Sequence, residues 1–258
     1  MKPANLDDIQ KSFTQQAKHF ESASMNFSKQ DYLDYTVRCM ELSPADRVLE
    51  AAAGTCACGR SVAPFVKSVV CLDATPAMLN VGREKAEESG LANMEFRQGL
   101  VEDIPFAEQI FDIVLTRLAF HHFSGVEKPF AEMARVLKKG GKLVVIDMEA
   151  AEEELRTIED HLETLRDPSH VKNLSKPEFL ALFAGHGFQV ARQESTIIPV
   201  SLKAWLALTE TPAGLGEEIR ARLEAELKGG PATGFKPYLK DGELYFEQRW
   251  LMMIGLKA

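Results

Sequence analysis

Short apolar runs alternate with longer amphipathic stretches from about residue 46 to residue 150. The runs are rich in Val, Ile and Leu, as is typical of strands that are buried on both faces. They predict five strands, at 48–49, 69–72, 94–96, 113–115 and 143–146. Helical stretches lie between them, at about 59–66, 76–89 and 125–138. Because strands that alternate with helices form parallel sheets with right-handed crossovers, we expect an α/β fold.

The chain on either side of this region is less regular. Ile9, Phe13, Ala17 and Phe20 lie three or four residues apart, which predicts one apolar face of a helix over 6–20. The later pattern predicts a helix at 152–166, a loop at 166–170, a helix at 175–184, a strand at 188–198, two helices within 201–230 and a last strand at 243–258. We therefore expect an N-terminal helical cap (1–40), a core (41–199), a helical insertion as substrate cap (200–240) and the final strand of the core sheet (241–258).

Charge and composition exclude several classes of partner. The formal net charge of the 258 residues is −8, and Lys138 with Lys139 is the longest basic run, so electrostatic attraction to nucleic acid is not expected. Charged residues interrupt the first twenty positions, and no apolar run approaches the length of a membrane span. We expect a cytoplasmic protein with no stable membrane insertion.

The four cysteines, Cys39, Cys56, Cys58 and Cys71, include no C-x-x-C pair. A cytosolic chain of this size neither needs nor easily keeps disulfides, so we interpret them as thiols. Structural zinc usually has four ligands in closely spaced pairs, which this pattern does not supply. The sequence therefore predicts no metal site.

The stretch "VLEAAAGTCACGR" at 48–60 contains an incomplete glycine loop. Gly54, Cys56 and Gly59 have the spacing of the dinucleotide fingerprint G-x-G-x-x-G, and Asp73 follows at a suitable distance. However, the middle glycine of that fingerprint lets the backbone approach a pyrophosphate. Glu50 would also bring a carboxylate towards that doubly charged group. The physics thus opposes a nicotinamide-dependent oxidoreductase, although the spacing leaves it as one alternative.

The same stretch also fits the pattern acidic-x-G-x-G-x-G, with Glu50, Ala52, Gly54 and Cys56 in the key positions. Three further motifs follow in order: "LDATPAML", "PFAEQIFDIVLTRLAFHHF" and "EMARVLKKGGKLVVID". With them, residues 46–150 resemble the class I S-adenosylmethionine-dependent methyltransferases, in particular the branch related to ubiquinone and menaquinone biosynthesis C-methyltransferases. The resemblance implies a Rossmann-like doubly wound seven-stranded sheet, mostly parallel with an antiparallel last strand, plus a helical cap.

The resemblance also implies the cofactor, S-adenosylmethionine, and its site. In the family, the acid matching Glu50 lies by the methionine moiety, the glycine matching Gly54 lets the backbone pass under the cofactor, and the acid matching Asp73 binds both ribose hydroxyls. A cationic cofactor without phosphate tolerates Glu50. The residues in matching positions are Glu50, Ala52, Gly54, Thr55, Cys56, Asp73, Thr75, Met78, Gly99, Leu100, Val101, Glu102 and Arg117.

Three positions depart from the family pattern. Ala52 replaces the first glycine at the cost of one methyl group, and Cys56 replaces the third, where close packing or a positive φ can be required. Leu100 stands where the family usually has an acid that holds the adenine amino group. Glu102 or Asp103 could substitute for that acid, or Leu100 could pack on the ring.

Methyl transfer requires alignment of donor and acceptor, and removal of a proton if the acceptor is neutral. Arg117, His121 and His122 follow the fourth strand and are the catalytic candidates; either histidine could act as a base or have a structural role. The candidates for substrate contacts are Phe13, Gln16, Phe20, His170 and Trp205. Trp205 could equally belong to the core of the cap.

The leading hypothesis is therefore an S-adenosylmethionine-dependent methyltransferase that acts on a small molecule. The alternative is a non-catalytic protein on the same fold that binds S-adenosylmethionine or S-adenosylhomocysteine, its loop blunted by Cys56 and Leu100. The acceptor atom, whether carbon, nitrogen or oxygen, does not follow from the sequence, because this fold hosts many reactions. A homodimer is left open.

Overall fold

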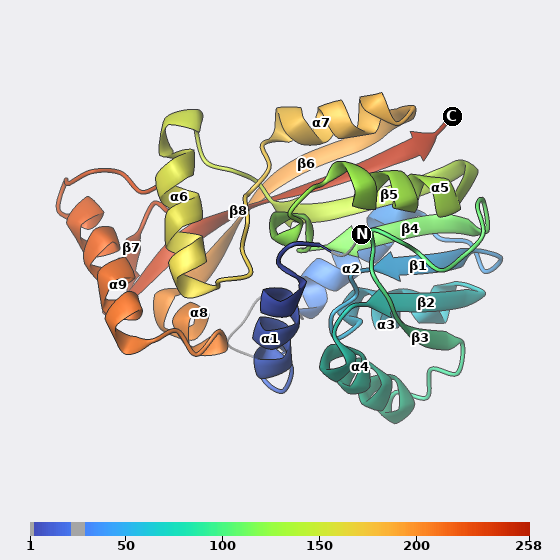
Figure 1. Ribbon diagram of the computed structural model, residues 1–258, viewed down its shortest axis with the longest axis horizontal. Helices are drawn as coiled ribbons and strands as arrows, with labels where there is room; N and C mark the ends of the chain where they lie inside the picture. The colour runs from blue at the N-terminus through green and yellow to red at the C-terminus, as the bar shows by residue number, and fades with distance from the viewer. Residues whose placement is uncertain (1–2, 22–28) are drawn as a thin grey trace.

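One mixed β-sheet runs the length of the molecule (Figure 1). The computed structural model describes residues 3–21 and 29–258. The strand order is β3-β2-β1-β4-β5-β8-β6, and β7 pairs with β8 off this path. The strands are β1 (Arg47–Ala51), β2 (Ser68–Asp73), β3 (Met94–Gln98), β4 (Phe111–Arg117), β5 (Leu137–Met148), β6 (Phe188–Ser201), β7 (Tyr238–Lys240) and β8 (Glu243–Lys257).

Helices cover both faces of the sheet. A second lobe, which holds α6, α8 and α9, surrounds the far ends of β6 and β8 (Figure 1). They are α1 (Leu6–Gln16), α2 (Gln30–Met40), α3 (Ala57–Val62), α4 (Pro76–Glu88), α5 (Glu127–Val136), α6 (Glu153–Arg166), α7 (Lys176–Gly185), α8 (Leu202–Leu208) and α9 (Ala213–Leu227). Two 3₁₀ turns, η1 (Ala63–Phe65) and η2 (Phe120–His122), complete the elements. Among the described residues, no helix is long and apolar enough to span a membrane.

The predicted Rossmann-like topology is confirmed. Strands β1 to β5 pair in parallel, whereas β8 runs antiparallel to both β5 and β6. The chain leaves β1 towards β2 on one side and returns to β4 on the other, so the direction of winding switches between β1 and β4. Ligands bind open α/β sheets outside the carboxyl ends of the strands at such a switch.

The central strands are buried on both faces, as their unbroken apolar sequence predicts. In β1, Val48 packs on one side with residues of α2 and α3, and Leu49 packs on the other with residues of α5 and α7. Successive side chains of a strand point to opposite faces, so Glu50 lies on the same face as Val48, under α3. This alternation places one carboxylate inside the core at the end of the strand.

The element boundaries differ from the predicted ones in several places, and no separate helix was predicted at α2. The first helix ends at Gln16 rather than at residue 20, and α5 ends at Val136 rather than at 138. Leu137 already belongs to β5, because it pairs with Phe111 of β4. The register of the two strands then shifts at the left-handed Gly140, and Ile113 pairs with Lys142. The three-residue strand β7 was not expected, since so short a segment carries no readable periodicity.

Candidate active site

A cleft of about 930 Å³, its open mouth included, lies at the carboxyl ends of β1, β2 and β4. The loops after these strands form its floor and sides. Helix α1 supplies an apolar cover through Leu6, Ile9 and Phe13, and Phe20 follows from the turn beyond the helix. The apolar stripe that predicts the first helix is therefore directed at the cleft rather than at the sheet core.

The glycine-poor loop after β1 adopts the left-handed backbone conformation at alternate residues. The φ angles of Ala52, Gly54 and Cys56 are 53°, 52° and 59°. Only glycine enters this region without a steric cost, and other residues incur about 1–2 kcal/mol. The left-handed backbone thus explains why the acidic-x-G-x-G-x-G pattern has glycine at all three positions. Ala52 costs more than we expected, because its backbone conformation is strained in addition to its extra methyl group.

Cys56 is accommodated by a glycine on the neighbouring helix. Its side chain is fully buried, and a Cβ built on Gly82 of α4 would lie 2.7 Å from its Sγ and 2.9 Å from the carbonyl oxygen of Thr55. The thiol donates weakly to the carbonyl oxygen of Gly54 at 3.6 Å. The third position of the loop therefore holds a side chain because α4 leaves room for it.

Glu50 joins the loop to the first turn of α3. Its Oε2 accepts a hydrogen bond from the backbone N–H of Gly59 at 2.8 Å, and Cys71 Sγ lies 3.6 Å away. A Cβ at position 59 would lie 2.6 Å from that oxygen, so only glycine permits the contact. Burial raises the pKa of Glu50 to about 7, against the lowering effect of the Gly59 N–H.

Glu50, Cys56 and Cys71 also bring three metal-type ligand atoms within 4.8 Å of one another. Burial raises the pKa of the Cys71 thiol well above its usual value, so it stays protonated and donates to Glu50. The pKa of Cys56 is raised as well. This triad is thus a hydrogen-bonded network of protonated thiols around one carboxylate, in keeping with the expected free thiols.

Asp73 ties the first two loops together at the end of β2. Its Oδ2 accepts from the N–H of Gly54 at 2.7 Å, and its Oδ1 accepts from the N–H of Thr75 at 2.8 Å. Burial raises the pKa of its carboxyl group, and these backbone donors work in the opposite direction. Each oxygen keeps a further lone pair with which to accept a hydroxyl group from the cleft.

Ten of the thirteen cofactor candidates line the cleft: Glu50, Ala52, Gly54, Thr55, Asp73, Gly99, Leu100, Val101, Glu102 and Arg117. Three candidates do not. Cys56 at the start of α3, and Thr75 and Met78 at the start of α4, are fully buried behind the loops that carry Gly54 and Asp73. Their contribution is to packing beneath the cleft.

The charges that line the cleft are mostly negative. Glu21, Glu50, Asp73 and Glu102 line it together with Arg117. Glu21 is engaged by Arg60 at 2.5 Å and by Lys85 at 2.8 Å. Such a surface favours a cationic ligand over one that carries a pyrophosphate, which agrees with the argument from Glu50.

His122 lines the cleft, and Ser169 fixes the position of its Nδ1 atom. Its Nδ1 lies 3.1 Å from both the carbonyl oxygen and the Oγ of Ser169, and that hydroxyl donates to Asp167 at 2.7 Å. Both neighbours of Nδ1 are therefore acceptors, so Nδ1 carries the proton and Nε2 keeps a lone pair. Burial and the adjacent His121 ring hold the pKa of His122 well below its usual range, so the ring is neutral at pH 7.

His121 points away from the cleft and into a buried polar network. Its Nδ1 lies 2.6 Å from Asp147 Oδ1. Asp147 Oδ2 also accepts from the N–H groups of Ala119 at 2.8 Å and Phe120 at 2.7 Å. Because Asp147 is the residue before the end of β5, it fixes the turn after β4 that carries both histidines.

The five candidate substrate residues separate into two groups. Phe13 and Phe20 line the cleft, with their ring centroids 6.1 Å apart. Gln16 donates to Asp167 instead, and Trp205 packs against Phe235 and Phe246. Trp205 thus belongs to the core of the second lobe.

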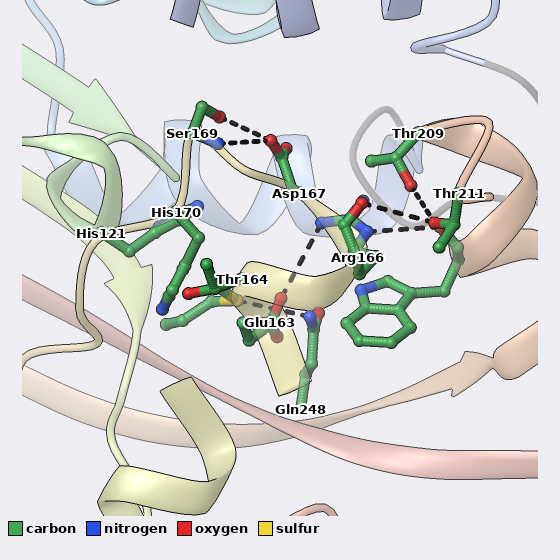
Figure 2. Close-up of polar contacts among 12 residues, drawn as sticks. His121, Glu163, Thr164, Arg166, Asp167, Ser169, His170, Thr209, Thr211 and Gln248 are labelled. Carbon is green, nitrogen blue, oxygen red and sulfur yellow. Dashed lines mark hydrogen bonds and ion pairs between the residues drawn. The ribbon is translucent and has the colours of Figure 1, made fainter. Parts of the chain in front are cut away.

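His170 lies in the polar cluster drawn in Figure 2, which also contains His121, Glu163, Arg166 and Asp167. Its Nε2 is 2.9 Å from Asp160 Oδ1, and its ring is 5.8 Å from that of His121. It does not line the cleft, because the loop at 166–170 turns its ring towards α6. The short loop before α7 therefore contributes through Asp167 and Ser169.

Sequence reasoning missed Asp167 and Ser169, although both lie in the predicted loop "RDPSH". They are more than forty residues from His122 in the chain, and no periodicity links the two segments. Ser12 of α1 also donates to Asp167, at 2.9 Å, so the cover and the histidine share one carboxylate. The only signal available was the unusual density of polar residues in the loop.

Comparison with known proteins agrees with this geometry. Residues 49–145 match the family model described as a methyltransferase domain. The chain is 34% identical over 198 residues to YcgJ of Bacillus subtilis, an uncharacterised methyltransferase, covering 76% of this chain and 78% of that protein. It is 33% identical over 120 residues to the ubiquinone/menaquinone biosynthesis C-methyltransferase UbiE of Vibrio vulnificus, covering 44% of this chain and 45% of that one.

Solved structures extend the likeness beyond the matched domain. The crystal structure of Bacillus subtilis YcgJ superposes with a TM-score of 0.79 at 30% identity, covering 89% of this chain and 99% of the other. A candidate methyltransferase from Bacillus halodurans superposes with a TM-score of 0.81 at 28% identity, covering 88% and 99%. The chain belongs to the methyltransferase-domain family of the class I methyltransferases. It is a methyltransferase, and its family implies S-adenosylmethionine as methyl donor.

Proposed function

We propose that the cleft binds S-adenosylmethionine and that the protein transfers its methyl group to a small molecule. The single observation that carries this proposal is the position of Glu50, Gly54 and Asp73. All three line one cleft at the point where the sheet changes its winding direction. When bound, the cofactor would supply a methyl group that its sulfonium centre has already activated.

The residues fit this cofactor in chemistry as well as in position. A carboxylate at Asp73, with lone pairs directed to the cleft, suits a pair of ribose hydroxyls. Glu50 and the other acidic groups suit a ligand that is cationic at sulfur and at its amino group. The left-handed backbone at Gly54 carries no side chain into the cleft, and a Cβ there would lie 4.0 Å from the ring of Phe20. The family resemblance assigns the same tasks to these positions.

We assign His122 as the group that accepts a proton from the substrate. Its neutral ring, with Nε2 unprotonated, can take up the proton that becomes acidic as the acceptor atom bonds to the methyl group. Asp167 then faces the resulting imidazolium through Ser169 Oγ, so its carboxylate stabilises the charge that forms on the ring. Arg117 serves as the cation at the cleft wall next to the acceptor.

Calorimetric titration with S-adenosylmethionine and S-adenosylhomocysteine tests the proposal. We expect both to bind to the wild type, and Asp73→Asn to weaken both by about tenfold or more, the loss of one charge-assisted hydrogen bond. Glu95→Gln, which removes an exposed acid from the neighbouring strand β3, is the matched control and should bind normally. Failure of the wild type to bind either compound would refute the proposal, and binding without any methyl transfer would identify a non-catalytic binding protein.

A further inference from the structure

A second cavity, of about 1030 Å³ with its mouth included, shares Arg117 with the first cleft. Its walls come from α2 and from the facing parts of β5, β6 and β8. Arg117, the last residue of β4, lines both spaces. The two cavities therefore have a wall in common at the carboxyl end of β4, next to the turn that carries His122.

The lining of the second cavity is aromatic and apolar within and charged at the rim. The rings of Tyr32 and Trp250 lie 5.9 Å apart at 53°. Ile146, Ile198 and Met252 line the same space. Flat rings and a polarisable thioether are favourable neighbours for another aromatic ring. The walls thus suit a planar aromatic molecule better than a flexible polar one.

Polar groups at the mouth are already paired with one another. The Tyr35 hydroxyl group donates to Glu194, which also binds Arg192 at 2.7 Å. The Arg38 guanidinium lies 5.8 Å from the centre of the Tyr35 ring. Asp31 is the other acidic residue of the rim. Because positive and negative groups are mixed there, the mouth does not itself select a charge.

The charge at the inner end is different. The Arg117 guanidinium lies 5.1 Å from the centre of the Trp250 ring, so a ring bound in this cavity would meet a cation at the wall shared with the first cleft. A nearby cation opposes an ammonium acceptor and stabilises the anionic form of a hydroxyl group. An acceptor oriented by Arg117 would therefore carry its hydroxyl group, rather than an amine, at this end.

We propose that the second cavity is the acceptor site and that it takes a planar aromatic compound whose hydroxyl group faces Arg117. This inference rests on the proposed function for the identity of the methyl donor. The new bond joins the methyl carbon to the hydroxyl oxygen as the bond between carbon and sulfonium breaks, and the hydroxyl proton passes to His122 Nε2. The products are an aryl methyl ether and a neutral thioether.

A substitution on β6 can obstruct the cavity while Arg117 and both histidines keep their own side chains. Thr196 lines the cavity, and Ile197 beside it is 54% exposed on the other face of the strand. The variant Thr196→Trp should fill the space, and Ile197→Trp adds the same side chain outside it. Equal melting temperatures would establish that both variants fold.

Binding of 2-naphthol in the presence of S-adenosylhomocysteine is the test, measured by saturation-transfer NMR and calorimetry. We expect binding to the wild type and to Ile197→Trp, and at least about a tenfold loss in Thr196→Trp. Saturated decahydro-2-naphthol and cationic 2-(aminomethyl)naphthalene should bind at least about tenfold more weakly than 2-naphthol. Affinity for S-adenosylhomocysteine should be the same in all three proteins.

Equal binding of 2-naphthol to Thr196→Trp, or no binding to the wild type, would overturn the acceptor site. Equal binding of the saturated or the cationic compound would overturn the substrate class. A wild type that fails to bind S-adenosylhomocysteine would instead refute the proposed function. The naphthol titrations are repeated without S-adenosylhomocysteine, so the two failures can be told apart.

Discussion

The two loops that bound the cleft keep their shapes in opposite ways. The loop after β1 holds Ala52 and Cys56 in a backbone conformation that their side chains disfavour, and Gly82 on the next helix makes room for one of them. The turn after β4 is held by hydrogen bonds to the buried carboxylate of Asp147. One loop is strained and supported by packing, whereas the other is supported by a charge. The two should therefore respond differently to substitution and to pH.

The largest expected effect is at the charge-supported turn. Asp147→Asn replaces one acceptor oxygen by an NH₂ group that faces other donors, and we expect the free energy of unfolding to fall by about 3 kcal/mol. Methyl transfer should fall with it, since both histidines lose their support. Urea denaturation measures the loss. Asp112→Asn, at a half-exposed site paired with Lys138, should cost less than about 1 kcal/mol, and equal losses would contradict the role of Asp147.

A large effect on rate without an effect on stability is expected at His122. Removing a positioned base typically costs about 10²–10⁴ in rate, so His122→Asn should lower kcat strongly. Affinity for S-adenosylhomocysteine should change little, because Glu50, Gly54 and Asp73, which carry the proposed cofactor contacts, lie on the loops after β1 and β2. Ser169→Ala should give a smaller loss, since the Ser169 carbonyl oxygen still accepts from Nδ1. An unchanged kcat in His122→Asn would assign the proton to another group.

An intermediate effect is expected at Glu50, with a defined dependence on pH. Its pKa of about 7 lies above the ordinary value of 4.5, so its burial increasingly destabilises the ligand-free protein as pH rises from 4.5 to about 7, and the loss is complete above that pH. Glu50→Gln should therefore melt higher than the wild type at pH 8 and equally at pH 5, as measured by calorimetry. Cofactor binding should show the reverse, because the ionised carboxylate attracts a cation.

Wild-type affinity for S-adenosylmethionine should accordingly rise between pH 6 and pH 8, because the Glu50 pKa of about 7 lies in this interval. Glu50→Gln should remove much of that rise. Equal pH profiles for the two proteins would show that Glu50 does not meet the bound ligand. The comparison also separates the strained loop from its carboxylate, since the substitution leaves the backbone of the loop unchanged.

The smallest effect is expected at the strained loop itself. Ala52→Gly removes a left-handed alanine and should raise the free energy of unfolding by about 0.5–1 kcal/mol. Ala57→Gly, five residues on in the first turn of α3, should lower it by up to about 1 kcal/mol, because that residue is helical. Urea denaturation of both variants should give opposite signs. The same sign in both would mean that the loop is not strained at Ala52.

The sequence predicted much of the fold for a simple reason. Strands buried on both faces leave unbroken apolar runs, and the helices between them have their own periodicity, so the order of β1 to β5 could be predicted. Glu50 and Asp73 could be found because each follows such a run. The strand β7 and the early end of α5 could not, since tertiary pairing rather than local pattern sets both.

The histidine site was only partly predictable. His121 and His122 are adjacent and of one type, so nothing local distinguishes the ring that enters the cleft from the ring that binds Asp147. Their roles depend on Ser169 and Asp147, which arrive from distant parts of the chain. The second cavity was also invisible, because its walls come from α2 and from strands far apart in sequence.

The most direct test of the account is a crystal structure of the protein with S-adenosylhomocysteine. We predict electron density in the cleft, with the ribose hydroxyls at Asp73, the amino acid moiety towards Glu50 and Gly54, and the sulfur on the side of Arg117. Density that places the ligand elsewhere, or none at saturating concentration, would contradict the claim that this cleft binds the methyl donor.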